Sequence, residues 1–275
     1  AKGRTYSMVA YECGPSYLMN GLNNVALTAD EQAVSRRYGR TLAAAVGTFD
    51  YLLYASLRGF KEMQFYAYTQ DRGLWCSHTH VHTGYRPHPA WLAATLVNHH
   101  IAARDLLATA HTALPVFDLI TTNTSGQQVV KTNVPLCSVY AAREGATYAV
   151  AVINKKLDGA HNGLDFGDGY TPVQLVLPFT NTAKITLYKL AGNLRATNLD
   201  GYSVSIVTQH ISVAAFSNVF TVNEATGGAA HGMPPGIFIY VFGDDPGTPP
   251  FITRHPQSTT IQVDASTNFT VEAGG

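Results

Sequence analysis

The first 110 residues alternate between strand-like and helix-like segments, and this alternation limits the folds open to the chain. Residues 7–11 form a short apolar run with the character of a strand. A capping box, Thr28-Ala-Asp-Glu31, then predicts a long helix from Ala29 to Arg58. Lys61–Thr69 is an aromatic-rich strand pattern, and a second helix is expected over Ala90–Ala110. This order predicts two βα units, too few to close a domain because a βα barrel needs eight.

A carboxylate stands where the first strand ends. Glu12 follows the apolar run directly, and the turn-forming pair Gly14-Pro15 comes almost at once. A βα barrel presents its catalytic groups in this way, at the carboxyl ends of its strands. The competing interpretation of the same sequence is an ordinary strand that ends in a solvated glutamate before a turn. The two βα units around it are what make Glu12 a candidate for catalysis.

From Leu114 onward the sequence changes to short strands separated by Gly and Asn turns. The clearest strand patterns are Val134–Val139, Tyr148–Ile153, Val173–Leu177, Lys184–Leu190, Ser203–Val207 and Ile237–Phe242. Their spacing predicts an antiparallel β-sandwich. The Gly- and Pro-rich residues 243–250 have the composition of a linker, and Thr259–Val263 and Asn268–Val271 beyond them are strand-like. We therefore expect three parts: residues 1–112, 113–243 and 244–275.

Composition excludes some functions and favours others. Lys and Arg together number 18, as do Asp and Glu, so a net charge of zero gives no basic face for nucleic acid. Charged residues are 13% of the chain, against about 25% in typical soluble domains. Low charge with abundant Tyr, Thr and Asn suits a secreted or cell-surface protein that handles sugars. No apolar run is long enough to predict a membrane span.

Three cysteines leave room for one disulfide at most. Cys13 and Cys76 each follow a predicted strand of the βα region, so a bridge between them is one interpretation. Two buried thiols are the other.

Several short motifs, taken in order, resemble the C-terminal part of a retaining clan-A glycoside hydrolase over roughly residues 1–243. The motifs are Tyr11-Glu12 with Gly14-Pro15, Trp75, Pro89-Ala90-Trp91, Val139-Tyr-Ala-Ala-Arg-Glu-Gly145, Ala149-Val-Ala-Val-Ile-Asn154 and Met233-Pro-Pro-Gly-Ile-Phe-Ile-Tyr240. The layout is similar to that of arabinofuranosidase-, xylosidase- and heparanase-like enzymes. The resemblance implies the seventh and eighth βα units of a (β/α)8 barrel, followed by a β-sandwich. Pro250–Ser258 and Phe269–Ala273 resemble the first strands of a bacterial immunoglobulin-like repeat.

Retaining glycosidases use two carboxylates, one as nucleophile and one as acid/base. The resemblance implies that Glu12, at the end of the seventh barrel strand, is the nucleophile. The acid/base would stand on a fourth strand that this chain does not contain. A second chain or a missing N-terminal barrel segment is therefore the expected partner. Asn223-Glu224 has the letters of an acid/base motif, but it lies among the later β-strands, and we interpret it as a coincidence.

The resemblance also implies where a carbohydrate substrate binds. Trp75 follows the eighth strand, where related enzymes place an aromatic ring on the sugar; packing at the barrel mouth is the competing role. The weaker candidates Tyr11, Tyr17 and Tyr68 are aromatic residues near the same strand ends.

A histidine cluster, His78-Thr-His-Val-His82, would place three imidazoles on one side of an extended segment. Contacts from His78 and His80 to sugar hydroxyls are one role for this cluster, and a solvated or structural loop is the other; we expect no metal and no cofactor. Two other functions compete with a glycosidase. One is a non-catalytic carbohydrate-binding or cell-surface structural protein that keeps the scaffold. The other is a metal-dependent hydrolase built on the histidines.

Overall fold

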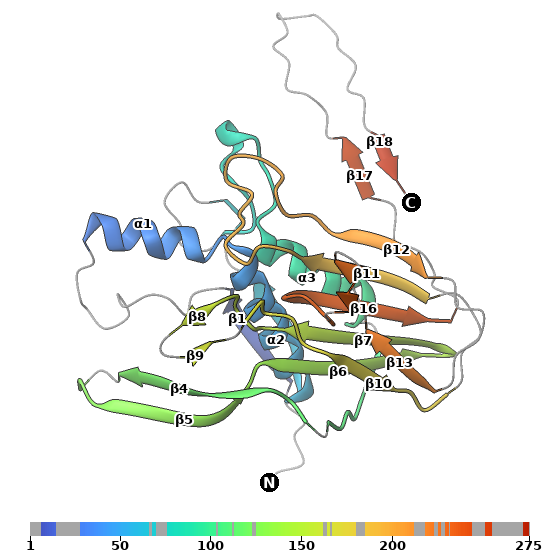
Figure 1. The fold of residues 1–275 in the computed structure, drawn as a ribbon. Helices are drawn as coiled ribbons and strands as arrows, with labels where there is room; N and C mark the ends of the chain where they lie inside the picture. Colours follow the sequence, from blue (N-terminus) through green and yellow to red (C-terminus); the bar gives the residue numbers. More distant parts are fainter. Residues whose placement is uncertain are drawn as a thin grey trace, which may run out of the picture.

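The computed structural model is mostly β-sheet with few helices (Figure 1). It describes residues 7–14, 28–65, 68–69, 76–102, 104–111, 113–122, 125–161, 164–165, 167–179, 185–211, 218–222, 225–226, 229–230, 232–243, 251–254 and 272–274. No helix within these ranges is both long enough and apolar enough to cross a membrane.

Two strands and three α-helices are found among the described residues up to His100. They are β1 (Met8–Cys13), α1 (Ala29–Tyr38), α2 (Leu42–Leu57), β2 (Phe60–Phe65) and α3 (Pro89–His100). β1 and β2 pair in parallel, with Met8 opposite Phe60 and Cys13 opposite Phe65. The predicted alternation of strand and helix is therefore present. Two strands are a fraction of the eight that a barrel needs, so the barrel itself stays a prediction.

The single helix predicted over residues 29–58 is wrong, because the chain breaks between α1 and α2. Thr41 is the N-cap of α2, and its side-chain oxygen accepts a hydrogen bond from the Ala44 amide. The Leu42 and Ala43 amides donate to the carbonyl oxygens of Ala196 and Leu194, each at 2.9 Å. A helix that starts at Thr41 has its free amides satisfied by a side chain and a distant loop. A continuous helix would exclude both.

The second predicted helix was also too long. α3 ends at His100, and Leu106 and Leu107 lie instead in β3 (Asp105–Leu107). His100, the last residue of α3, is 3% exposed. Its ring stacks on Tyr188 with the centroids 3.9 Å apart. Packing of α3 against the sheet explains this burial.

A six-stranded antiparallel sheet forms the centre of the molecule, in the order β12-β11-β16-β7-β6-β3. Its other strands are β6 (Cys137–Glu144), β7 (Thr147–Asn154), β11 (Ile185–Ala191), β12 (Val207–Ile211) and β16 (Gly236–Phe242). Three of the predicted strands match β7, β11 and β16 closely. The pattern Val134–Val139 was wrong because Leu136 separates two strands, and Ser203–Val207 was wrong because β12 begins where that pattern ends.

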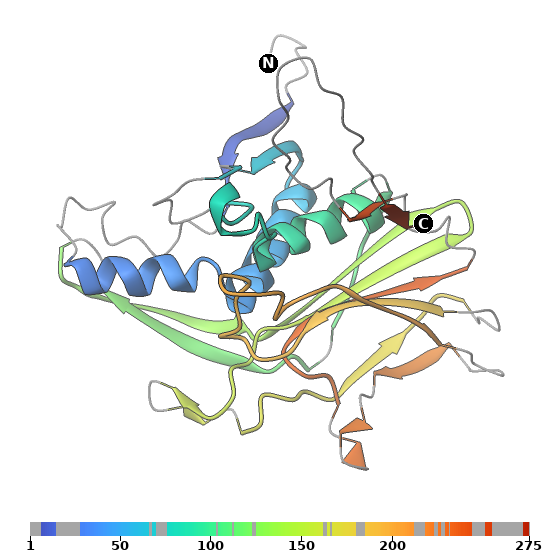
Figure 2. The ribbon, with the colours of Figure 1, turned by 90° about the horizontal axis from the view of Figure 1, so that it is seen from above.

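The sheet is buried on both faces, as the side chains of β16 show. Ile237, Ile239 and Val241 belong to the hydrophobic core that includes α2 and α3. Phe238 and Phe242, which alternate with them, face a second core with β10 (Val173–Val176) and β13 (Val219–Val222). Figure 2 shows the helices on one side of the sheet and the β10–β13 pair on the other. This pair covers the sheet, but the predicted two-sheet sandwich is not established by it.

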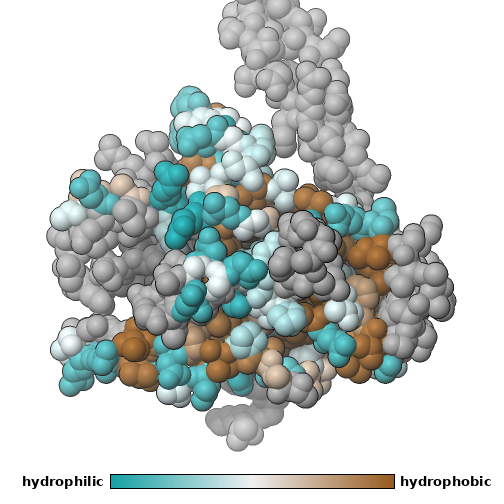
Figure 3. Space-filling model, viewed as in Figure 1, coloured by the Kyte–Doolittle hydropathy of each residue, from teal (hydrophilic) through white to brown (hydrophobic). Residues whose placement is uncertain are grey.

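The remaining strands form antiparallel pairs at the periphery. They are β4 (Val116–Thr122) with β5 (Gln128–Pro135), β8 (Ala160–His161) with β9 (Leu164–Asp165), β14 (Ala225–Thr226) with β15 (Ala229–Ala230), and β17 (Phe251–Arg254) with β18 (Glu272–Gly274). The β4–β5 hairpin exposes branched side chains such as Ile120 and Val130, and Figure 3 shows apolar surface where Figure 1 places this hairpin. Residues 244–250 and the strand patterns at 259–263 and 268–271 lie outside the described residues, so the immunoglobulin-like repeat stays a prediction.

A polar network joins α2 to the central sheet. The Tyr140 hydroxyl donates to Asp50 Oδ1 at 2.8 Å, and Lys155 Nζ lies 2.8 Å from Asp50 Oδ2. Lys155 also donates to the Ser138 hydroxyl at 2.8 Å. Burial and the negative charge of Asp50 raise the pKa of Tyr140, so its hydroxyl stays a donor.

Replacing Tyr140 with Phe should destabilise the protein by about 2 kcal/mol, because the Asp50 carboxylate loses a charge-assisted hydrogen bond. Tyr148→Phe is the matched control: this tyrosine is on the neighbouring strand β7, and its side-chain contacts among the described residues are made by its ring, with Phe179 and Arg143. Urea unfolding at neutral pH measures both variants. Equal midpoints for Tyr140→Phe and the wild type would contradict the prediction.

Candidate functional site

Glu12 lies at the C-terminal end of β1, one residue before the Cys13–Phe65 pair. Its side chain is exposed, and Tyr11 beside it is 84% exposed. Within the described part of the chain, no hydrogen bond or ion pair holds the Glu12 carboxylate. The carboxylate is therefore accessible to a ligand.

The loop after β2 is closed by its own backbone hydrogen bonds. The His78 amide donates to the Tyr68 carbonyl at 3.1 Å, and the His88 amide donates to Ser77 O at 2.8 Å. The Thr79 amide donates to Arg86 O at 2.8 Å, so the two ends of the 79–86 loop are hydrogen-bonded to each other. These contacts fix the loop at the same end of the parallel pair as Glu12.

Four aromatic rings gather here, three from this loop and the ring of Trp91 from α3. The His78 ring stacks on Tyr85, with centroids 4.8 Å apart and an interplanar angle of 9°. It also contacts Tyr68 at 5.3 Å and Trp91 at 5.6 Å. Tyr68 is 63% exposed, so one ring of the cluster faces outward. Two predicted site residues, Tyr68 and His78, are thus brought together. The ring of Tyr85, which was not among the predicted site residues, contacts both of them.

The three histidines do not face one side, so the extended segment assumed for them was wrong. His80 is the N-cap of a turn of 3-10 helix, Val81–Thr83, and His82 lies within that turn, whereas His78 precedes both. His80 and His82 lie at the loop tip with ring centroids 4.8 Å apart, and His80 Nδ1 accepts from the His82 amide at 3.3 Å. Among the described residues, no group of three His, Cys, Asp or Glu side chains could hold a metal ion.

A segment more than a hundred residues away clamps this loop. Arg86 Nε donates to the carbonyl of Asn198 at 2.9 Å, and Arg86 Nη2 donates to Leu199 O. The side-chain amide of Asn198 donates to Pro87 O at 2.9 Å and to Val204 O at 2.8 Å. Asn198 is fully buried, and sequence reasoning missed it because no local pattern links it to Arg86.

His88 is completely buried beneath the loop. Burial, together with the charges of Arg40, His78 and Arg86, lowers its pKa to about 3. Neither ring nitrogen has a hydrogen-bond partner among the described residues. The imidazole is therefore neutral in the folded protein at every ordinary pH.

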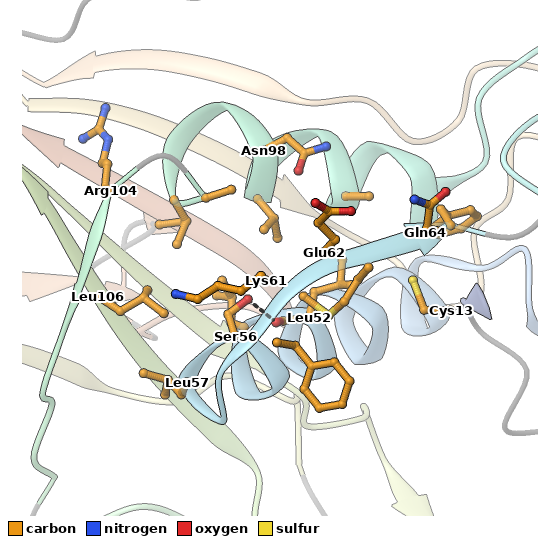
Figure 4. A pocket seen from close by; sticks show the side chains of 18 of the residues that line it. Cys13, Leu52, Ser56, Leu57, Lys61, Glu62, Gln64, Asn98, Arg104 and Leu106 are labelled. Atoms are coloured by element: carbon orange, nitrogen blue, oxygen red, sulfur yellow. Dashed lines mark hydrogen bonds between the residues drawn. The ribbon is translucent and has the colours of Figure 1, made fainter. Parts of the chain in front are cut away.

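A pocket of about 800 Å³ lies beside β2, between that strand and helices α2 and α3 (Figure 4). Lys61, Glu62 and Gln64 of β2 and Asn98 of α3 line it, together with apolar side chains. Glu12 is not among its lining residues, although Cys13 is. The pocket is therefore separate from the predicted catalytic carboxylate.

Several predicted residues cannot be placed. Trp75 and Tyr17 lie outside the described residues, as does Asn223-Glu224. Cys13 and Cys76 are both buried free thiols, so the disulfide interpretation was wrong and the two-thiol interpretation is confirmed. Burial raises the pKa of the Cys13 thiol, which makes it a poor nucleophile.

Comparison with solved structures finds a similar fold in arabinofuranosidases. The α-L-arabinofuranosidase of Thermotoga maritima, in its arabinose complex, superposes with a TM-score of 0.54 at 15% identity over 73% of this chain and 38% of that one. The GH51 α-L-arabinofuranosidase of Thermotoga petrophila RKU-1 superposes with a TM-score of 0.52 at 15% identity, over 73% of this chain and 38% of that one. Another arabinofuranosidase superposes with a TM-score of 0.53 at 13% identity, over 74% of this chain and 38% of that one. No family model and no curated protein matches the sequence. The likeness concerns the fold, and the chain spans 38% of the length of these enzymes.

Acid should destabilise the protein through His88. The unfolded histidine, with an ordinary pKa of 6.5, binds a proton that the folded one with a pKa of about 3 rejects. The contribution of His88 to stability is therefore complete above pH 6.5 and falls by about 1.4 kcal/mol per pH unit between pH 6.5 and pH 3. Urea unfolding between pH 7 and pH 5 measures the slope, which should be shallower in His88→Gln. The exposed His99, changed to Gln, is the control and should keep the wild-type slope. Equal slopes in all three proteins would contradict the prediction.

Proposed function

We propose that this chain is part of a retaining glycoside hydrolase, with Glu12 as the nucleophile. The observation that carries the proposal is the exposed carboxylate at the end of β1, in a fold shared with arabinofuranosidases. In this mechanism the Glu12 carboxylate attacks the anomeric carbon as the leaving oxygen takes a proton from the acid/base. Water then hydrolyses the glycosyl ester, and the same acid/base removes a proton from that water.

The acid/base is supplied by a barrel portion outside this chain, either a second polypeptide or another segment of the same protein. The exposed apolar side chains of β1 support this. Met8 and Val9 are 45% and 55% exposed, an unusual state for a barrel strand. On the other side, successive residues of β2 line an open pocket. The missing βα units would cover both flanks.

The substrate is a polysaccharide or oligosaccharide, and the protein acts outside the cell or at its surface. Tyr68 and His78 support this choice because they form an aromatic cluster with an outward ring, and sugar C–H groups pack well on such rings. His80 stands at the tip of the same loop. Trp75 and Tyr17 complete the proposed set of binding residues, with Tyr11 next to the nucleophile.

A non-catalytic carbohydrate-binding role is the second candidate. The observation in its favour is that nothing in the described structure positions the Glu12 carboxylate. Intact-mass and peptide analysis of the native protein separates the two candidates. A barrel portion with an Asn-Glu at the end of its fourth strand supports the enzyme, and a barrel portion without it supports the binding protein.

Mechanism-based trapping tests the assignment of Glu12. A 2-deoxy-2-fluoro-arabinofuranosyl fluoride should glycosylate the native protein as the carboxylate displaces fluoride, and mass spectrometry should place the sugar on the peptide that contains Glu12. Glu12→Gln should abolish labelling and lower kcat by orders of magnitude, because an amide is a far weaker nucleophile. Glu62→Gln, which removes an exposed carboxylate from β2, should leave both unchanged. A label on any other carboxylate would exclude Glu12 as the nucleophile.

A further inference from the structure

Tyr85 has a backbone conformation that residues with side chains rarely adopt. Its φ is +52°, in the left-handed region, and Gly84 before it has a φ of +99°. A bulky residue in this region costs free energy, and it persists only where its surroundings hold it there. The Tyr85 ring nevertheless stacks on His78 with an interplanar angle of 9° and contacts Tyr68 at 5.4 Å. Neighbouring groups must therefore hold Tyr85 in place.

The residue after Tyr85 supplies this restraint. The Arg86 guanidinium donates through Nε to Asn198 O and through Nη2 to Leu199 O. An arginine fork is planar and rigid, so two contacts fix its direction as well as its position. A Cβ atom on Gly84 would collide with this guanidinium, so glycine is needed there for space as well as for its φ. The strained pair of residues and the arginine contacts thus form one unit.

The acceptors of Arg86 lie on a loop that the side chain of Asn198 closes. Asn198 Oδ1 accepts from the Val204 amide at 2.8 Å, and its Nδ2 donates to Val204 O at 2.8 Å. The same Nδ2 donates to Pro87 O at 2.9 Å. Asn198 is fully buried, so water does not compete for these bonds. Two loops from different halves of the chain are therefore bonded to each other at Arg86 and Pro87.

We infer that Arg86 and Asn198 are positioning residues that act through Tyr85, and that they set the affinity of the aromatic cluster for a carbohydrate. That the ligand is a carbohydrate rests on the proposed function; the positioning does not. The ring of Tyr68, 63% exposed, is the surface that a sugar can reach, and Tyr85 packs against it. Rings that are already fixed lose less freedom when a ligand binds. Without the arginine contacts, the backbone at Tyr85 would relax to a negative φ and carry its ring away from His78.

Nuclear magnetic resonance tests the positioning without turnover and without ligand. Above pH 7, the stacked Tyr85 ring should shift the His78 ring protons upfield, with the signals assigned by their loss in His78→Gln. Arg86→Gln removes the fork of a half-buried side chain and should move these protons toward the positions of an unstacked histidine. Asn198→Asp, which keeps the side-chain acceptor but loses both donors, should do the same. Arg195→Gln removes an exposed arginine from the same segment and is the matched control, which should leave the spectrum unchanged.

Calorimetric titration of the native protein with L-arabinose supplies the second readout. Arg86→Gln should bind the sugar roughly tenfold more weakly than the wild type, a usual size for coupling between separate groups. Arg195→Gln should bind it as the wild type does. Equal affinities in the wild type and Arg86→Gln, or no binding to the wild type, would overturn the role in carbohydrate affinity.

The spectra decide the positioning by themselves. Unstacked His78 shifts in the wild type would overturn it, even if the Asn198→Asp variant failed to fold. Unchanged His78 shifts in a folded Arg86→Gln variant would overturn it as well. Failure of the Glu12 labelling would remove the glycosidase proposal but would not change these spectra.

Discussion

The structure depends on one shared hydrophobic core, in which helices α2 and α3 pack between the parallel strands and the central sheet. Residues from β1, both helices and alternate positions of β16 meet in a single cluster. A helix pair of this size buries too little against two strands to be stable alone. Its second face is covered by the six-stranded sheet, and the Asp50 network ties the two together. The first part of the chain therefore needs the later strands in order to fold.

Apolar patterning was enough to predict the elements that this core requires. β7 and β16 are long runs of branched and aromatic residues, and both are buried on two faces, so their sequences show them clearly. The errors fall where non-local contacts decide. The break before α2 depends on carbonyl groups of Leu194 and Ala196. β3 forms by pairing with the edge of β6. Neither partner is visible from local periodicity.

The candidate site was predictable in type but not in arrangement. The strand end that carries Glu12 could be recognised because a short apolar run stops at a Gly-Pro turn. The neighbourhood of His78 could not, because alternation along an extended segment suggested three histidines in a row. His80 caps a turn of 3-10 helix that contains His82, while His78 contacts Ser77 and Tyr85, so the rings have different environments. Such contacts depend on loop closure, which single-residue propensities do not encode.

The segment between β11 and β12 has a consequence for engineering. Its carbonyl groups at residues 194 and 196 complete the first turn of α2, and those at 198 and 199 hold Arg86 in the strand-end loop. One stretch of the β-rich half thus serves as both a helix cap and a loop anchor for the other half. The two halves are not interchangeable modules: a chimera that grafts a different β-domain onto these βα units would lose both supports, even if its sheet packed well against the helices.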